Sequence, residues 1–269
     1  MPDRRWLILE IEAPLIAFGG VAIDHVGVTR DFPAASMLTG LFANALGWQR
    51  TDCDRHQALQ DRLIFAARLD RESPTGLLTD MQNAQLDKKD RGWTTWGIVE
   101  GRDGASYGAP HRRRRDYHMD ARVVMAVTLA PPAGDHGEGA TPDLDTLATA
   151  LHRPARPLFI GRKTCLPSRP LLPARREDWF VEAPDAYEAL ARVPWPASPA
   201  IRVSSKRTAA ASETPAPLRA FWPLGEGPDD GAAVHHIHDL PDLRNWRSGL
   251  HGGARPVVEG VVMAGGPAV

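Results

Sequence analysis

The chain has 269 residues, which is enough to bury a hydrophobic core in one large domain or, as we expect, in two smaller ones. A hydrophobic share of 43% and a charged share of 24% are ordinary for a soluble globular protein, whereas 24 glycines and 24 prolines argue against long regular helices. The formal net charge of -1 shows no overall basic excess, and the two distant cysteines, Cys53 and Cys165, exclude a disulfide framework and a CxxC metal pair.

The first half of the chain predicts alternating strands and helices. Apolar alternation and a valine-rich run predict strands over residues 6–11, 63–69 and 122–129. A helix is expected from Pro33 to Gly47, because its apolar residues recur every three or four positions and glycine suits its C-terminal end. A second helix is expected with Thr141 as its N-cap and Pro142 as its first residue. This order is most of a ferredoxin-like unit, which RNA-recognition domains use.

A polar insertion over residues 77–120 interrupts this unit. It is rich in glycine and carries Trp93, Trp96 and Tyr107 among its charged residues. A structureless loop of this length is uncommon inside a compact domain. The insertion is therefore expected to be either a protruding β-hairpin or a segment that a partner orders.

We expect an α+β chain of two parts. Residues 1–156 would form a ferredoxin-like or RNA-recognition-like domain with the insertion at about 78–117. Residues 157–269 would hold a glycine loop and a small β-rich C-terminal domain that ends in a strand over 257–263. The run Trp6–Ile11 starts as a strand without a secretory signal pattern, and no apolar stretch is long enough to span a membrane, so a cytoplasmic location is expected.

Positive charge is concentrated in two segments although the total is near zero. Between Lys88 and Arg122 there are nine lysines and arginines against five acids, and between Arg156 and Arg176 there are six and no acid. The strongest local signal is the run Arg112, Arg113, Arg114 and Arg115, followed by Tyr117 and His118. Guanidinium groups pair with phosphate oxygens and stack on bases. The run also fits a solvated charge cluster, but nearby aromatic residues favour RNA, because stacking contributes about 1–3 kcal/mol per base.

A second signal is the turn made by Gly161, Arg162 and Lys163 after a short apolar run. Glycine permits the tight turn, and its neighbours offer backbone N–H groups and two cations to a phosphate. The same residues also fit an ordinary tight turn with two exposed cations. The residues alone leave both interpretations open.

Catalytic and metal sites find less support. A metal cluster would draw on His235, His236, His238, Asp239 and His251. No zinc pattern is complete, and no nucleotide-binding or nucleophile motif is present, so we expect no metal, no cofactor, and histidines that pack or lie on the surface. A metal-independent ribonuclease needs a general acid and a general base. Suitable side chains are Tyr117, His118, His111 and Lys163, so this activity is kept as the alternative.

Five collinear stretches carry a family resemblance. They are WLILEIEAPLIAFGG (residues 6–20), RDFPAASMLTGLFANALG (30–47), residues 59–70, HRRRRDYHMDAR (111–122) and PLFIGRKTCLPSRPL (157–171). Together they resemble the CasD family of type I-E CRISPR Cascade over about the first two thirds of the chain. The chain departs from the family in its long glycine-rich insertion and in its extended region 194–230.

The resemblance implies a fold and a function. The fold is an RNA-recognition-like domain with a protruding β-hairpin thumb, here at about 78–117, that kinks the guide where handle meets spacer. Family members cap the 5′ handle of the guide RNA (crRNA), contact the large PAM-reading subunit and the last backbone subunit, and meet target DNA through the complex. In the related type I-C branch the matching subunit cuts the repeat RNA, whereas type I-E uses a separate endonuclease. No catalysis is therefore expected here.

The resemblance also implies contact residues. Ser36 and Thr39 match the helix-opening motif, whose polar end lies near the handle, and Arg162 and Lys163 match the glycine loop. The expected RNA contacts are Ser36, Thr39, Arg112, Arg113, Arg114, Arg115, Tyr117, His118, Arg162 and Lys163.

Overall fold

The computed structural model describes residues 2–20, 22–23, 25–73, 76–85, 91–93, 98–100, 110–132, 141–195 and 217–265. The longer strands are β1 (Arg4–Ile16), β4 (Leu63–Arg71), β5 (Leu77–Ala84), β8 (His111–Leu129), β9 (Phe180–Ala183), β10 (Leu218–Pro223), β11 (Val234–Arg244) and β12 (His251–Val262). Short strands are β2 (Ala22–Ile23), β3 (Val26–Gly27), β6 (Gly92–Trp93) and β7 (Val99–Glu100). The helices are α1 (Ala35–Ala45), α2 (Cys53–Arg62), α3 (Leu144–His152) and α4 (Ala186–Arg192), with a 3-10 turn, η2 (Arg176–Trp179).

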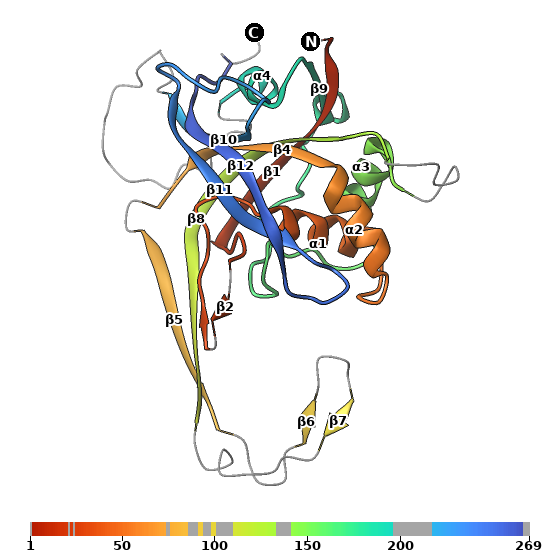
Figure 1. Cartoon of the computed structure of the whole chain (residues 1–269), viewed down its shortest axis with the longest axis vertical. Coiled ribbons are helices and arrows are strands. Elements are labelled where there is room, and N and C mark those ends of the chain that lie inside the picture. The colour runs from red at the N-terminus through yellow and green to blue at the C-terminus, as the bar shows by residue number, and fades with distance from the viewer. Residues whose placement is uncertain are drawn as a thin grey trace.

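One sheet organises the body (Figure 1), with the strand order β11-β12-β10-β4-β8-β1-β9. All neighbours along this path are antiparallel. Val127 in β8 lies opposite Leu7 of β1 on one side and Phe65 of β4 on the other. Strands from both sides of residue 156 join this sheet, because β9 pairs with β1 and β10 pairs with β4. The division of the chain at residue 156 stays a prediction.

Hydrophobic side chains cover both faces of the sheet. On one face Leu7, Leu9 and Ile11 of β1 join a cluster with the apolar residues of α1, α2 and α3. On the other face Trp6 and Ile8 pack with α4 and β10. The architecture is a mixed, sheet-dominated fold with four α-helices among the described residues. Within that part of the chain, no helix is both long and apolar enough to cross a bilayer.

The predicted strands over 6–11, 63–69, 122–129 and 257–263 are confirmed as parts of β1, β4, β8 and β12, and the predicted first helix is confirmed as α1. The start of the second predicted helix was wrong. Asp143 caps α3 by accepting a hydrogen bond from the Thr146 N–H at 2.7 Å, so the helix begins at Leu144 rather than after Thr141. Asp143 offers a carboxylate at the right spacing, and an acid also suits the positive end of a helix.

The polar insertion begins and ends as paired strands. β5 pairs with the first part of β8, from Leu77 opposite His118 to Ala84 opposite His111. In Figure 1 these two strands leave the body together and run downward. Trp96 and Tyr107 lie outside the described residues, as does the stretch 196–216 of the extended region.

Candidate nucleic-acid interface

The arginine run lies on β8, in the hairpin that leaves the body. Arg112, Arg113 and Arg114 are exposed and Arg115 is half-buried. Because side chains alternate along a strand, Arg112 and Arg114 lie on one face of the hairpin and Arg113 and Arg115 on the other. The run that looks continuous in the sequence therefore presents two cations to each face.

Few acids neutralise these arginines. Arg114 forms an ion pair with Asp116 at 3.3 Å, and the buried Asp116 carboxylate also accepts a hydrogen bond from Thr79 at 2.8 Å. Among the described residues, no carboxylate forms an ion pair with Arg112, Arg113 or Arg115. The hairpin thus carries positive charge that an external phosphate backbone could neutralise.

Arg162 holds β3 against β8 at the base of the hairpin. Its guanidinium donates to the carbonyl oxygens of Asp116 at 2.9 Å, Gly27 at 2.7 Å and Val28 at 3.0 Å. It also lies 4.9 Å from the centre of the Tyr117 ring. These contacts use donors on both terminal nitrogens of the side chain that was expected to contact RNA, so in this structure Arg162 acts as a clamp between strands.

Replacing Arg162 with methionine is expected to lower the free energy of unfolding by about 2 kcal/mol, because three carbonyl groups would be left without a charged donor. The exposed Lys163 is the control, since Lys163→Ala should change stability by less than about 0.5 kcal/mol. Urea unfolding of both variants measures the difference. Equal stability of R162M and the wild type would show that the clamp contributes nothing.

Tyr117 and His118 lie against the body rather than on an open surface. Tyr117 is buried, and its hydroxyl accepts a hydrogen bond from Thr164 at 3.4 Å. A ring nitrogen of His118 lies 2.7 Å from the Arg30 carbonyl oxygen, and its ring centre is 4.9 Å from that of Phe18. The structure therefore brings Tyr117, His118 and Arg162 together, but the Tyr117 ring has no exposed face on which a base could stack.

The first turn of α1 opens onto a hollow of about 520 Å³. Half-buried Ser36 lines it, together with Arg30, Arg244 and His251. Thr39 does not reach the hollow, because it is fully buried and its hydroxyl donates to the Ala35 carbonyl at 2.8 Å. Sequence reasoning found Ser36 and missed the others, since they come from separate segments and no motif links them.

A residue from the end of the chain caps α1. Asp242 of β11 accepts a hydrogen bond from the Ala35 N–H at 2.9 Å, and Arg255 of β12 binds the same carboxylate at 2.9 Å. Ala34 occupies the N-cap position and has no side chain that could do this. The C-terminal strand pair thereby fixes the helix end beside Ser36.

The C-terminal histidines do not converge. His236 and His238 share a side of β11, with ring centres 5.8 Å apart, and His238 lies 2.8 Å from a carboxylate oxygen of Glu259. Burial alone would raise the pKa of Glu259, but hydrogen bonds from His238 and Arg219 outweigh it and lower that pKa below its ordinary value. Within the described residues, no three His, Cys, Asp or Glu side chains are placed to hold a metal ion.

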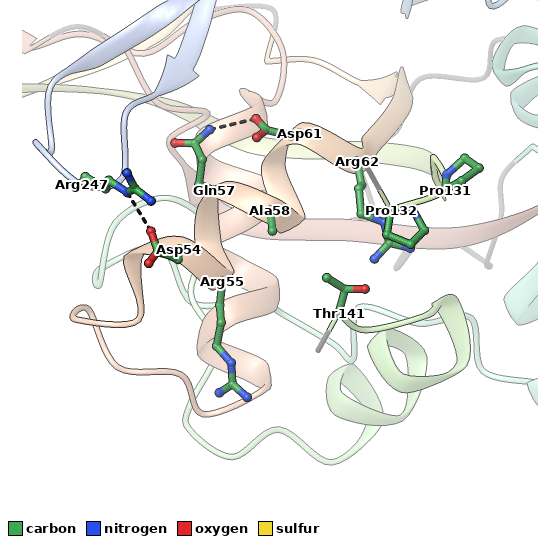
Figure 2. A pocket seen from close by; sticks show the side chains of 10 residues that line it. All are labelled: Asp54, Arg55, Gln57, Ala58, Asp61, Arg62, Pro131, Pro132, Thr141 and Arg247. Carbon is green, nitrogen blue, oxygen red and sulfur yellow. Dashed lines mark hydrogen bonds and ion pairs between the residues drawn. The ribbon is translucent and has the colours of Figure 1, made fainter. Parts of the chain in front are cut away.

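A second hollow, of about 450 Å³, runs along the outer face of α2 (Figure 2). Two of its three cations are already engaged, and the third, Arg55, lies over the Trp48 ring, 5.5 Å from its centre. Arg247 pairs with Asp54 at 2.7 Å, and Arg62 donates to the carbonyl oxygens of Ala130 at 2.8 Å and Pro142 at 2.9 Å. Figure 2 also shows the hydrogen bond that the Gln57 side chain donates to Asp61. Mixed and satisfied charges make this hollow a poorer phosphate site than the one beside Ser36.

Comparisons with known proteins agree with one another. The CasD subunit of the CRISPR system Cascade of Escherichia coli (strain K12) is 29% identical over 168 residues, which cover 62% of this chain and 70% of that protein. A solved CRISPR RNA-guided surveillance complex contains a chain that matches 96% of this one, over 90% of its own length, at 22% identity and a TM-score of 0.64. The crystal structure of a Cas protein matches 97% of this chain and 100% of its own, at 22% identity and a TM-score of 0.52.

The two structural matches are likenesses of fold. The match to a family model is a match of sequence, and it runs from residue 6 to residue 258, so it includes both the arginine-bearing β8 and the residues of β11 and β12 that cap α1. That model describes the CRISPR-associated proteins Cas_Cas5. The chain belongs to the Cas5 family of CRISPR-associated proteins.

Proposed function

We propose that the chain is a non-catalytic subunit of a type I-E Cascade complex in antiviral defence. It binds and caps the 5′ handle of the crRNA in the cytoplasm, bridges the large PAM-reading subunit and the backbone filament, and meets target DNA through the assembled complex. One observation carries the proposal: Arg112, Arg113 and Arg115 have no carboxylate partner among the described residues. The similarity to a protein named as a Cascade subunit supports it.

The strand order supports an RNA-recognition-like fold for the first part of the chain. β1, β4, β8 and β9 occur in this order along the chain, with other short strands and the β5 strand between them. Helices follow β1 and β8. In the sheet the four strands lie in the order β4-β8-β1-β9. When β1, β4, β8 and β9 are numbered 1 to 4 in chain order, their order in the sheet is 2-3-1-4, which is that of a ferredoxin-like unit. The β5–β8 hairpin would then be the thumb that meets the guide RNA.

The two histidines named for the endoribonuclease alternative are not placed to act as an acid–base pair. His111 and His118 are seven residues apart on one extended strand, so their backbones lie about 23 Å apart. They also point to opposite faces of that strand. A general acid and a general base must both reach one phosphodiester group, and these two histidines cannot.

The test is the quadruple variant R112A/R113A/R114A/R115A. Its affinity for a single-stranded handle RNA is expected to fall on the order of 100-fold at physiological salt. An arginine that neutralises a phosphate releases condensed counterions, and the variant loses this favourable contribution to binding. The slope of log affinity against log salt should become shallower by about 0.7 for each phosphate that is no longer neutralised. Binding titrations over a salt series measure both quantities.

The control variant is R175A/R247A, which removes two exposed cations that are each paired with a carboxylate. It should bind the RNA as the wild type does. Quadruple and wild-type proteins of equal affinity would overturn the proposal. Discrete products from a repeat RNA incubated with the wild-type chain without metal would favour the endoribonuclease instead.

A further inference from the structure

Two arginines from distant segments converge on one glycine. Arg244 ends β11, and Arg50 lies between α1 and α2. A Cβ atom added to Gly249 would lie 3.2 Å from Nη2 of Arg244 and 4.0 Å from Nη2 of Arg50, so both guanidinium groups approach the same point. They line a hollow of about 300 Å³ together with Thr51, Cys53 and Trp246.

No acid within the described ranges balances this pair of cations. Among the described residues, neither Arg50 nor Arg244 forms an ion pair with a carboxylate, and Nε of Arg244 is buried with no hydrogen-bond partner. Burial and the neighbouring Arg50 charge both lower the pKa of Arg244. Arg247, in the same turn, differs because Asp54 neutralises it. Two like charges held together without a counter-ion are stabilised when an anion binds between them.

The arrangement is held in place by α2. Buried Gln60 donates to the Arg244 carbonyl at 2.9 Å and accepts hydrogen bonds from the Arg244 N–H at 3.1 Å and the Trp246 indole at 3.0 Å. The Trp246 ring stacks on His56 with centres 4.7 Å apart, and the Arg244 guanidinium lies 5.1 Å from the Trp246 ring. Arg244 is thus positioned before any ligand arrives, which lowers the entropic cost of binding.

We propose that Arg50 and Arg244 bind a phosphodiester group of a nucleic-acid strand. The planar fork of each guanidinium matches the paired oxygens of a phosphate. Arg244 and Gly249 also line the hollow that contains Ser36 and Arg30, so the two hollows adjoin at these residues. The inference rests on the proposed function and extends it, because a strand that passes Ser36 reaches the Arg50–Arg244 pair next.

The test compares the full-length R50A/R244A variant with the wild type, using handle RNA and a DNA duplex as separate probes over a salt series. Affinity for one probe is expected to fall about 10-fold or more, and its salt slope to become shallower by about 0.7 for RNA or about 0.9 for the duplex, because one phosphate is no longer neutralised. The probe whose affinity falls in this way identifies the strand. R50E serves as a second variant, because Arg50 is exposed and a reversal of its charge leaves the hydrophobic core unchanged.

The control is R175A, which removes an exposed cation that does not line this hollow and should leave affinity unchanged because Asp178 already pairs with it. If the wild type binds RNA and both R50A/R244A and R50E bind either probe as tightly as it does, the inference is overturned while the proposed function survives. If the wild type binds neither probe, the proposed function fails and the inference fails with it. An equal fall in affinity for R175A would also overturn the site, since general charge would then explain the effect.

Discussion

Replacing Gly161 with alanine is expected to lower the free energy of unfolding by about 3 kcal/mol. Gly161 has a φ of 79°, in the left-handed region where a side chain costs about 1–2 kcal/mol. A Cβ atom there would also lie 1.8 Å from the Ala17 carbonyl oxygen, so the segment just after β1 or the glycine loop must move, at a further cost of about 1–3 kcal/mol. Urea unfolding with a shared slope for both proteins measures the difference.

Gly225 provides the control for Gly161. It has a similar φ of 85°, but an added Cβ atom would meet nothing within 4 Å. Gly225→Ala should therefore cost only about 1 kcal/mol, which isolates the backbone strain from the close approach to Ala17. Equal destabilisation of the two variants would show that the contact with Ala17 is not what requires glycine in the loop.

Arg68→Ala is expected to cost about 4 kcal/mol. Arg68 and Asp70 are both fully or almost fully buried, and two hydrogen bonds of 2.6 and 3.1 Å join them. The same guanidinium donates to the carbonyl oxygens of Leu190 at 2.7 Å and Val193 at 2.8 Å, at the end of α4. Removing one partner leaves a buried charge and two carbonyl groups without their donor, which is the costly way to break such a pair.

The exposed ion pair of Arg247 and Asp54 is the control for the buried pair of Arg68 and Asp70. Arg247→Ala should leave the free energy of unfolding almost unchanged, because both side chains of that pair are exposed and water screens them. Thermal and denaturant unfolding of the two variants under the same conditions measure the contrast. A destabilisation below about 1 kcal/mol for R68A would mean that the buried pair does not hold α4 to the sheet.

The sequence predicted those elements whose apolar residues follow a regular period. β1, β4, β8 and α1 all bury such residues, and all four were found at their expected places. α2 was missed because its buried positions are His56, Leu59 and Gln60, so most of its inner face is polar. α4 was missed because it has only seven residues, and its buried positions are two alanines and one leucine, too few to establish a period.

The candidate site was only partly predictable for a different reason. Local runs such as Arg112–Arg115 show where charge is concentrated, but not which guanidinium groups the protein uses itself. Arg162 donates to three carbonyl groups that lie in and beside β3 and on β8, and nothing near residue 162 in the sequence indicates this. The RNA contacts assigned to Arg162, Tyr117 and Thr39 stay predictions, and their placement inside the fold makes Lys163 and the hairpin arginines the stronger candidates.

The cap on α1 has a consequence for biosynthesis. Asp242 is translated 207 residues after Ala35, whose N–H donates to it. A nascent chain that has emerged only as far as β10 therefore already contains α1 but lacks Asp242, the residue that caps the N-terminal end of this helix. Fragments made by stalled ribosomes or by proteases would lack the completed surface beside Ser36, so a ligand that needs this surface would bind only the intact polypeptide.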